Sequence, residues 1–184
     1  MCASGPLDDN DGMTETLAKG KAWAVAPAPV DTPEAAALLR DFYIDVADRY
    51  RMLHLGRRST PTEIEEELAG APSDDLAPPS GVFLLGRHRG RPAACAGLRV
   101  LGPEVVELTR VFVHPHWRGS GGGACLLAAV DETASSMGAK RIVLDTRLDL
   151  VDARALYIKH GYTEIPAYNQ GEYAEIWYGK ELGT

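Results

Sequence analysis

The chain has few cysteines, and their spacing suits neither metal binding nor redox chemistry. Cys2, Cys95 and Cys125 are the three cysteines in 184 residues. An odd number without paired spacing indicates neither a disulfide framework nor a zinc site. His114 and His116 flank a proline, a spacing typical of a turn, and no third ligand accompanies them. The sequence therefore predicts no metal and a reducing, cytoplasmic location.

The chain also lacks long apolar runs and an excess of positive charge. It contains no stretch of 18 or more apolar residues and no basic segment followed by an apolar one, so we expect neither a membrane span nor a secretion signal. With 19 basic and 26 acidic residues, the net charge is −7. This charge argues against a nucleic-acid partner and favours cationic or neutral ones.

What the chain does have is enough apolar sequence for one core. Hydrophobic residues make up 45% and charged residues 24%, as in soluble folded proteins. At roughly 150 residues per domain, the length predicts one domain. Residues 1–20 hold four carboxylates among Gly, Ser and Thr, with little apolar content to anchor them. We interpret residues 1–20 as a flexible acidic tail and residues 21–184 as a single domain.

Two helix-start signals occur in the first half of the chain. Thr32 and Pro33 open a helical pattern that we expect over residues 33–50. Thr60 and Glu63 form a capping box before a short helix that Gly70 ends. The apolar run over residues 22–30 precedes them, and its prolines favour an edge strand.

The second half of the chain begins with three successive antiparallel strands and continues with helices and strands in alternation. We expect strands over 82–85, 93–101 and 105–113, a glycine-opened helix over about 121–137, a strand over 142–144, a helix with Tyr157 on its apolar stripe, and strands over 162–165 and 174–178. The order βααβββαβαββ predicts an α+β fold with a mixed, mostly antiparallel sheet.

A glycine-rich loop, residues 118–123 (RGSGGG), separates a predicted strand from a predicted helix. Free N–H groups at a helix N-terminus favour anions, and Arg118 adds a forked cation. The sequence has no Gly-Lys-Ser/Thr motif for a triphosphate, and only Asp145 could act as the acidic residue of a dinucleotide site. The loop therefore predicts a phosphate group other than that of ATP or NAD, unless it is only a flexible turn.

Two motifs resemble those of the GNAT superfamily of N-acetyltransferases. Residues 111–123 (VFVHPHWRGSGGG) are similar to a strand followed by Arg/Gln-x-x-Gly-x-Gly/Ala, and residues 153–162 (ARALYIKHGY) are similar to Ala-x-x-Leu-Tyr-x-x-x-Gly-Phe/Tyr. Ser120, Gly122 and Leu150 depart from residues that are frequent in the family. The resemblance implies a GNAT-like sheet with helices on both faces.

The resemblance also implies an activity and a cofactor site. We expect transfer of an acetyl group from acetyl-CoA to the primary amine of a small molecule or of an amino-terminal group. Main-chain groups of Val111 and Val113 would hold the pantetheine arm, and the loop would bind the diphosphate through Arg118, Gly119, Ser120, Gly121, Gly122, Gly123 and Ala124. Helices 33–50 and 61–70 and the loop 166–173 would wall the acceptor pocket. The sequence leaves open whether the protein forms a homodimer.

Tyr157 and Glu107 are the candidate catalytic residues. Tyr157 matches the tyrosine that commonly protonates the departing CoA thiolate in the family. Glu107 would deprotonate the amine through water, on the strand face that strict alternation makes it share with Val111. The alternatives are a core tyrosine and a carboxylate paired with Arg110 or Arg99. The alternative function is a non-catalytic acyl-CoA-binding or regulatory module.

Overall fold

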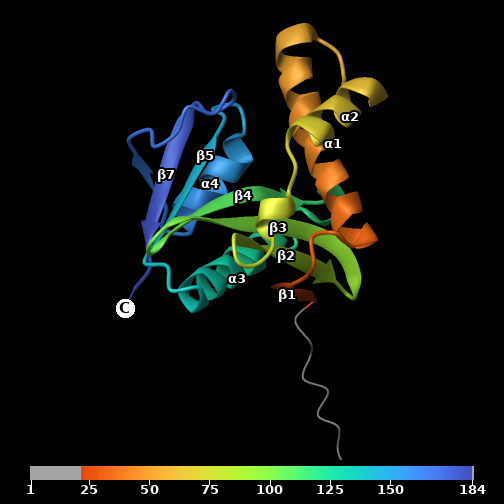
Figure 1. Cartoon of the computed structure of the whole chain (residues 1–184). Coiled ribbons are helices and arrows are strands. Elements are labelled where there is room, and N and C mark those ends of the chain that lie inside the picture. Colours follow the sequence, from red (N-terminus) through yellow and green to blue (C-terminus); the bar gives the residue numbers. More distant parts are fainter. Residues whose placement is uncertain (1–21, 184) are drawn as a thin grey trace, which may run out of the picture.

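The computed structural model describes residues 22–183, in which seven strands form one sheet with the order β1-β2-β3-β4-β5-β7-β6 (Figure 1). The predicted tail, 1–20, lies outside the described residues. The strands are β1 Trp23–Pro27, β2 Gly81–His88, β3 Arg91–Gly102, β4 Val105–Val113, β5 Arg141–Thr146, β6 Thr163–Ile165 and β7 Ile176–Glu181. The α-helices are α1 Pro33–Leu55, α2 Pro61–Gly70, α3 Gly122–Ser136 and α4 Val151–Lys159.

This order of elements confirms the α+β prediction, and all strand pairs except β4 with β5 are antiparallel. The largest difference in bounds is at α1, which continues to Leu55 instead of ending at Tyr50. Gly56, at a left-handed φ of 67°, ends the helix there and donates its N–H to the Met52 carbonyl. Among residues 22–183, no helix combines the length and the apolar character needed to span a membrane.

The two predicted helix starts are formed by their threonines. Thr32 Oγ1 accepts a hydrogen bond from the Ala35 N–H at 3.3 Å. At α2, Thr60 Oγ1 accepts from the Glu63 N–H at 3.3 Å, and the Glu63 carboxylate accepts from the Thr60 N–H at 2.7 Å. Both caps satisfy N–H groups that the first helical turn leaves without partners.

Each face of the sheet is covered by helices, because apolar side chains alternate along the strands. Leu84, Ala94 and Leu98 belong to the cluster that contains the buried face of α3. Phe83, Cys95 and Phe112 belong to a second cluster that contains Ala35, Leu38 and Leu39 of α1. Strand neighbours therefore point to opposite cores, as the period of two requires.

The sheet opens between its two central strands. β4 and β5 pair in parallel only over Val105–Glu107 and Arg141–Val143. Beyond these residues β4 continues along β3, while β5 continues along β7 as far as Thr146. Figure 1 shows β5 and β7 turning away from β4. Within residues 22–183, no strand therefore pairs with this edge of β4 beyond Glu107.

β4 carries one extra residue at the start of this opening. The residue pairs Cys95 with Phe112 and Gly97 with Thr109 span two steps on β3 but three on β4. Arg110 takes a positive φ of 54° in this bulge. A bulge reverses the alternation of the strand, so residues before and after it exchange faces.

Gly122 at the start of α3 lies directly against Trp23 of β1. A Cβ atom built at Gly122 would lie within 2.8 Å of three ring atoms of Trp23. The ring is held in place because its Nε1–H donates to the Ser120 carbonyl at 3.1 Å and to Ser120 Oγ at 3.0 Å. The close approach explains why a glycine stands where the family frequently has a larger residue.

We expect Gly122→Ala to lower the free energy of unfolding by about 1–3 kcal/mol, because the indole ring must shift to admit one methyl group. Gly70→Ala is the matched control, since no atom lies within 4 Å of a Cβ built there. Urea denaturation followed by circular dichroism measures both changes. Equal stability of Gly122→Ala and the wild type would contradict this account of the contact.

Candidate functional site

A groove of about 520 Å³ runs beside the glycine-rich loop, between β4 and α4. Val111 and Val113 line it from β4, and Leu150, Ala153 and Leu156 line it from α4 and the residue before it. The loop contributes Arg118, Gly119, Gly121, Gly122, Gly123 and Ala124. Of the residues that the sequence predicted to bind the cofactor, all but Ser120 therefore meet at one groove.

The loop presents backbone donors to this groove. Gly119 and Gly121 take left-handed φ values of 78° and 91°, which other residues rarely adopt. The first N–H to bond back into α3 is that of Cys125, which donates to the Gly121 carbonyl at 3.1 Å. The N–H groups of Gly122, Gly123 and Ala124 thus precede the helical ladder and are oriented for an anion.

Arg118 and Ser120 are held within the loop. Arg118 donates to the Asp45 carboxylate of α1 at 2.9 Å and to the Val113 carbonyl at 3.0 Å. The Ser120 hydroxyl donates to the Trp117 carbonyl at 2.6 Å and accepts from Trp23. The Ser120 N–H also donates to the Trp117 carbonyl, at 3.3 Å. Ser120 therefore stabilises the loop through its contacts with Trp117 and Trp23 and does not line the groove.

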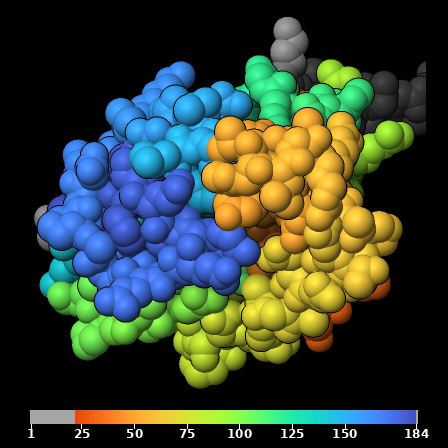
Figure 2. All heavy atoms as spheres, turned by 90° about the horizontal axis from the view of Figure 1, so that it is seen from above, coloured from red at the N-terminus to blue at the C-terminus, as the bar shows by residue number. Residues whose placement is uncertain are grey.

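A cleft of about 450 Å³ adjoins the groove, and both are lined by Val46, Val111, Leu150 and Ala153. The walls are formed by α1, by Glu67 of α2, by β4 and β5, and by Asn169, Gly171 and Tyr173. The sequence predicted α1, α2 and the loop 166–173 as walls of an acceptor pocket, and each of them contributes to the lining of this cleft. Figure 2 shows α1 and α2 lying beside the C-terminal segment on this face, and the rings of Tyr50 and Tyr173 meet there at 5.4 Å.

Tyr157 lines the cleft from α4. Its side chain is buried, with its ring 5.7 Å from that of Tyr162 and 6.3 Å from that of Tyr178. Burial, together with the Asp145 carboxylate, raises the pKa of the Tyr157 hydroxyl above its usual value. The hydroxyl is therefore protonated at neutral pH and able to donate.

Glu107 lines the same cleft and is buried. Its carboxylate accepts from Arg99 at 2.8 Å and from the Tyr168 hydroxyl at 2.9 Å, so the ion pair with Arg99 forms and one with Arg110 does not. The prediction that Glu107 shares a strand face with Val111 is wrong. Val106, Leu108, Val111 and Val113 all pack on the α3 side, because the bulge at Arg110 reverses the alternation between Glu107 and Val111.

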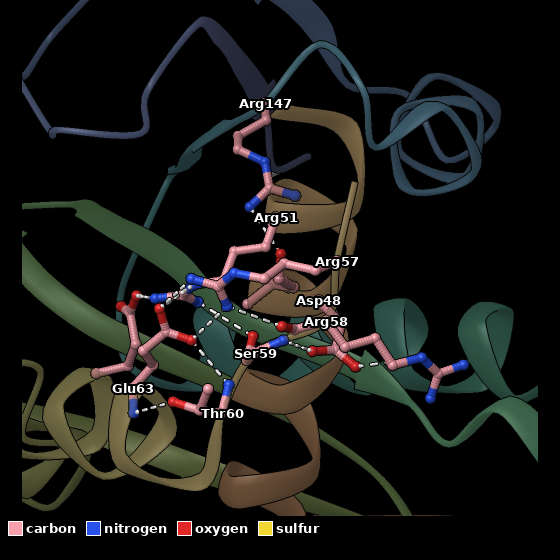
Figure 3. A network of polar contacts seen from close by, with 10 residues as sticks. Asp48, Arg51, Arg57, Arg58, Ser59, Thr60, Glu63 and Arg147 are labelled. Carbon is pink, nitrogen blue, oxygen red and sulfur yellow. Dashed lines mark hydrogen bonds and ion pairs between the residues drawn. The ribbon is translucent and has the colours of Figure 1, made fainter. Parts of the chain in front are cut away.

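Polar contacts fix α1 as a wall of the cleft (Figure 3). Arg147, which follows β5, donates to the Val46 carbonyl of α1 at 3.0 Å and pairs with Asp149 at 2.7 Å. Slightly further along the C-terminal half of α1, the Asp48 carboxylate accepts from the Ser59 N–H at 2.7 Å, and Arg51 contacts Glu63 at 3.4 Å. These contacts join α1 both to β5 and to α2.

Sequence reasoning missed Arg147 and, although it named the loop 166–173 as a wall, assigned no role to Tyr168 or Asn169. Asn169 donates to Asp145 at 2.6 Å and accepts from the Trp177 indole at 2.8 Å. Each of these side chains has at least one partner that lies 24 or more residues away in the sequence. No local pattern marks such pairs, so no signal in the chain could have identified them.

The comparison with protein families decides what this site belongs to. The model of the Acetyltransferase (GNAT) family matches residues 41–162, which include most of α1, the glycine-rich loop and Tyr157. The chain belongs to the GNAT acetyltransferase family. The family uses acetyl-CoA as its acetyl donor, and this GNAT chain is accordingly an acyltransferase.

Relatives and solved structures agree with this assignment. An uncharacterized N-acetyltransferase of Schizosaccharomyces pombe is 27% identical over 139 residues, which cover 71% of this chain and 85% of that protein. A GNAT acetyltransferase from Staphylococcus aureus has the same fold, with a TM-score of 0.64 and 17% identity over 88% of this chain and 99% of that one. A GNAT enzyme of Elizabethkingia anophelis with acetyl-CoA bound has a TM-score of 0.57 and 19% identity, and the match covers 87% of this chain and 98% of that one.

We expect Ala124→Glu to weaken CoA binding at least about tenfold, because a carboxylate in the first turn of α3 repels a diphosphate. The helix itself tolerates the change, since an acidic residue near its N-terminus is favourable. Ala128→Glu, one turn later on an exposed position outside the groove, is the matched control. Calorimetric titration with CoA separates the two, and equal affinities would contradict the placement of the diphosphate.

Proposed function

We propose that this GNAT enzyme transfers the acetyl group of acetyl-CoA to the primary amine of a small molecule or of an amino-terminal group. The observation that carries the proposal is the parting of β4 and β5, which joins the loop-side groove to a cleft containing Tyr157 and Glu107. Among proteins of similar fold is the ribosomal-protein-S18-alanine N-acetyltransferase of Escherichia coli, with a TM-score of 0.58.

The groove suits the two polar parts of CoA. The free N–H groups of Gly122, Gly123 and Ala124 would hold the diphosphate, and Arg118 adds a positive charge at the loop. Among residues 22–183 no strand pairs with this edge of β4 at Val111 and Val113, so its backbone groups would bond the amide groups of the pantetheine arm, with the Val113 carbonyl shared with Arg118. Acetyl-CoA bound in this way supplies an activated thioester at the junction of groove and cleft.

Two proton movements are then required of the chain. The acceptor amine must lose a proton before it can attack, and Glu107 would take that proton through water. Arg99 and Tyr168 hold the Glu107 carboxylate in place within the cleft. The departing CoA sulfur must gain a proton, which the Tyr157 hydroxyl would donate. In this proposal Glu107 accepts the proton of the attacking nitrogen, and Tyr157 supplies the proton of the leaving sulfur.

Release of CoA in a panel of primary amines tests the function as a whole. The protein is incubated with acetyl-CoA and each amine, and a thiol reagent follows the rate at which free CoA appears. This rate is compared with the rate measured without amine. Binding of CoA without amine-dependent release would favour the non-catalytic module. The cytoplasmic location, the homodimer and the expectation that no metal takes part stay predictions from the sequence.

Tyr157→Phe is expected to lower kcat about 100-fold, the usual effect of a lost general acid. Because burial raises the pKa of Tyr157, its hydroxyl stays protonated even at the pH where an ordinary tyrosine begins to lose its proton. We therefore expect kcat of the wild type to show no decline from this group between about pH 7 and about pH 10. Steady-state kinetics across this range measure both effects.

Tyr162→Phe is the matched control for Tyr157. Tyr162 is also buried, yet it lies outside both cavities, and within residues 22–183 its hydroxyl has no hydrogen-bond partner. We therefore expect kcat to be unchanged in Tyr162→Phe. Equal kcat values for Tyr157→Phe and the wild type would return Tyr157 to a purely structural role.

Glu107→Gln is expected to lower kcat/KM about 100-fold at acidic pH, where little of the amine is neutral, and less at alkaline pH. Glu104→Gln removes the same charge from an exposed turn and serves as the control. A pH–rate profile measures both variants. Identical profiles for Glu107→Gln and the wild type would leave amine deprotonation to bulk solvent.

A further inference from the structure

The acceptor cleft is lined by more arginines than carboxylates, although the whole chain is acidic. The charged lining residues are Arg51, Glu67, Arg99, Glu107, Arg110, Asp145 and Arg147. Most of these charges are neutralised by neighbours. Arg51 pairs with Glu67 at 3.3 Å, Arg99 with Glu107 at 2.8 Å, and Arg147 with Asp149 at 2.7 Å. Two charged lining residues, Arg110 and Asp145, have no ion-pair partner among residues 22–183.

Arg110 has no carboxylate within 4 Å in the described chain. Its Nη1 donates to Thr109 Oγ1 at 3.1 Å, and its Nη2 reaches the Ala71 carbonyl at 3.5 Å. Its Nε is buried without any partner among residues 22–183. The guanidinium lies 5.3 Å from the centre of the Tyr43 ring. A guanidinium has five N–H donors, so this cation is under-satisfied in a partly dry site.

The backbone keeps this cation in the cleft. Arg110 is the bulged residue of β4, and its φ of 54° is uncommon for any residue with a Cβ. A strained position at the rim of a site is a frequent mark of function. Arg110 borders the cleft but not the groove beside the glycine-rich loop. An anion that meets Arg110 therefore belongs to the acceptor and not to CoA.

Asp145 is the complementary charge. It is the first residue of β5 that lines the cleft, and it accepts a hydrogen bond from the neutral amide of Asn169. No arginine, lysine or histidine pairs with it within residues 22–183. Asp145 lines the same cleft as Tyr157, where the transfer would take place. An ammonium group that approaches the acetyl donor would meet this carboxylate.

We propose that the acceptor is an amino acid, a primary amine that also bears a carboxylate, with its ammonium group facing Asp145 and its carboxylate facing Arg110. The proposal rests on the proposed function, because it names the class of amine acetylated at that site. A guanidinium matches a carboxylate by two parallel hydrogen bonds, which gives it geometric specificity. Arg110 and Asp145 act here as specificity-determining residues.

Matched acceptors test the proposal. Each protein amino acid is compared with its amide and with the amine left after loss of the carboxylate. We expect the acid form of the preferred amino acid to have a kcat/KM about 30-fold or more above those of its two partners, because the neutral compounds leave Arg110 unpaired. Arg110→Gln should remove this preference by lowering kcat/KM for the acid alone.

Two further variants make the result specific. Arg91→Gln removes the same charge from an exposed position on the β2–β3 hairpin and should change neither rate nor preference. Asp145→Asn should lower kcat/KM for acid and amide alike, because both carry the ammonium group. Loss of preference in Arg91→Gln, or its survival in Arg110→Gln, would overturn the role of Arg110.

Calorimetry with CoA present separates this inference from the proposed function. An amino acid that binds to the wild type but not to Arg110→Gln, without any release of CoA, would support the inference and overturn the activity. Acetylation of amines without a preference for the acid form would support the proposed function and overturn the inference about the amino acid. If no amino acid binds or reacts, the inference is wrong.

Discussion

The extra residue in β4 at Arg110 is the constraint on which both cavities depend. Without it, Glu107 and Val111 would point to the same side of the sheet. With it, Glu107 faces the cleft with its partner Arg99, while Val111 and Val113 pack on the α3 side and leave their backbone edge to the groove. A single strand can therefore present a charged side chain to one cavity and its main chain to another.

The parting of β4 and β5 adds the space that the bulge alone could not create. Two strands that stay paired leave no room between them, since paired strands lie about 4.8 Å apart. Here pairing ends at Glu107 and Val143, and α1, bound through Arg147, covers one side of the opening. The site is thus a gap in a sheet, held open by contacts between elements that are far apart in the sequence.

Local charge differs from net charge in this protein. The total of −7 favours cationic partners, yet four arginines and three carboxylates line the cleft. The net charge sets the long-range field, whereas a partly dry cleft responds to the nearest groups and to whether they are paired. Within residues 22–183, the cleft holds one cation and one anion without an ion-pair partner, and for the proposed acceptor these two charges are more informative than the sum over the whole chain.

The sequence alone was sufficient for the order of elements, the caps at Thr32 and Thr60, the glycine-rich loop and the family motifs, because each depends on residues within a few positions of one another. The two catalytic candidates that it named, Tyr157 and Glu107, line the same cleft, and their roles stay proposals. The face of Glu107, the rear position of Ser120, the glycine at 122 and the unpaired Arg110 were decided only in the tertiary structure. The bulge has no glycine or asparagine to mark it, and the other features depend on Trp23, Arg99 and β5, whose contacts form only when distant segments pack together.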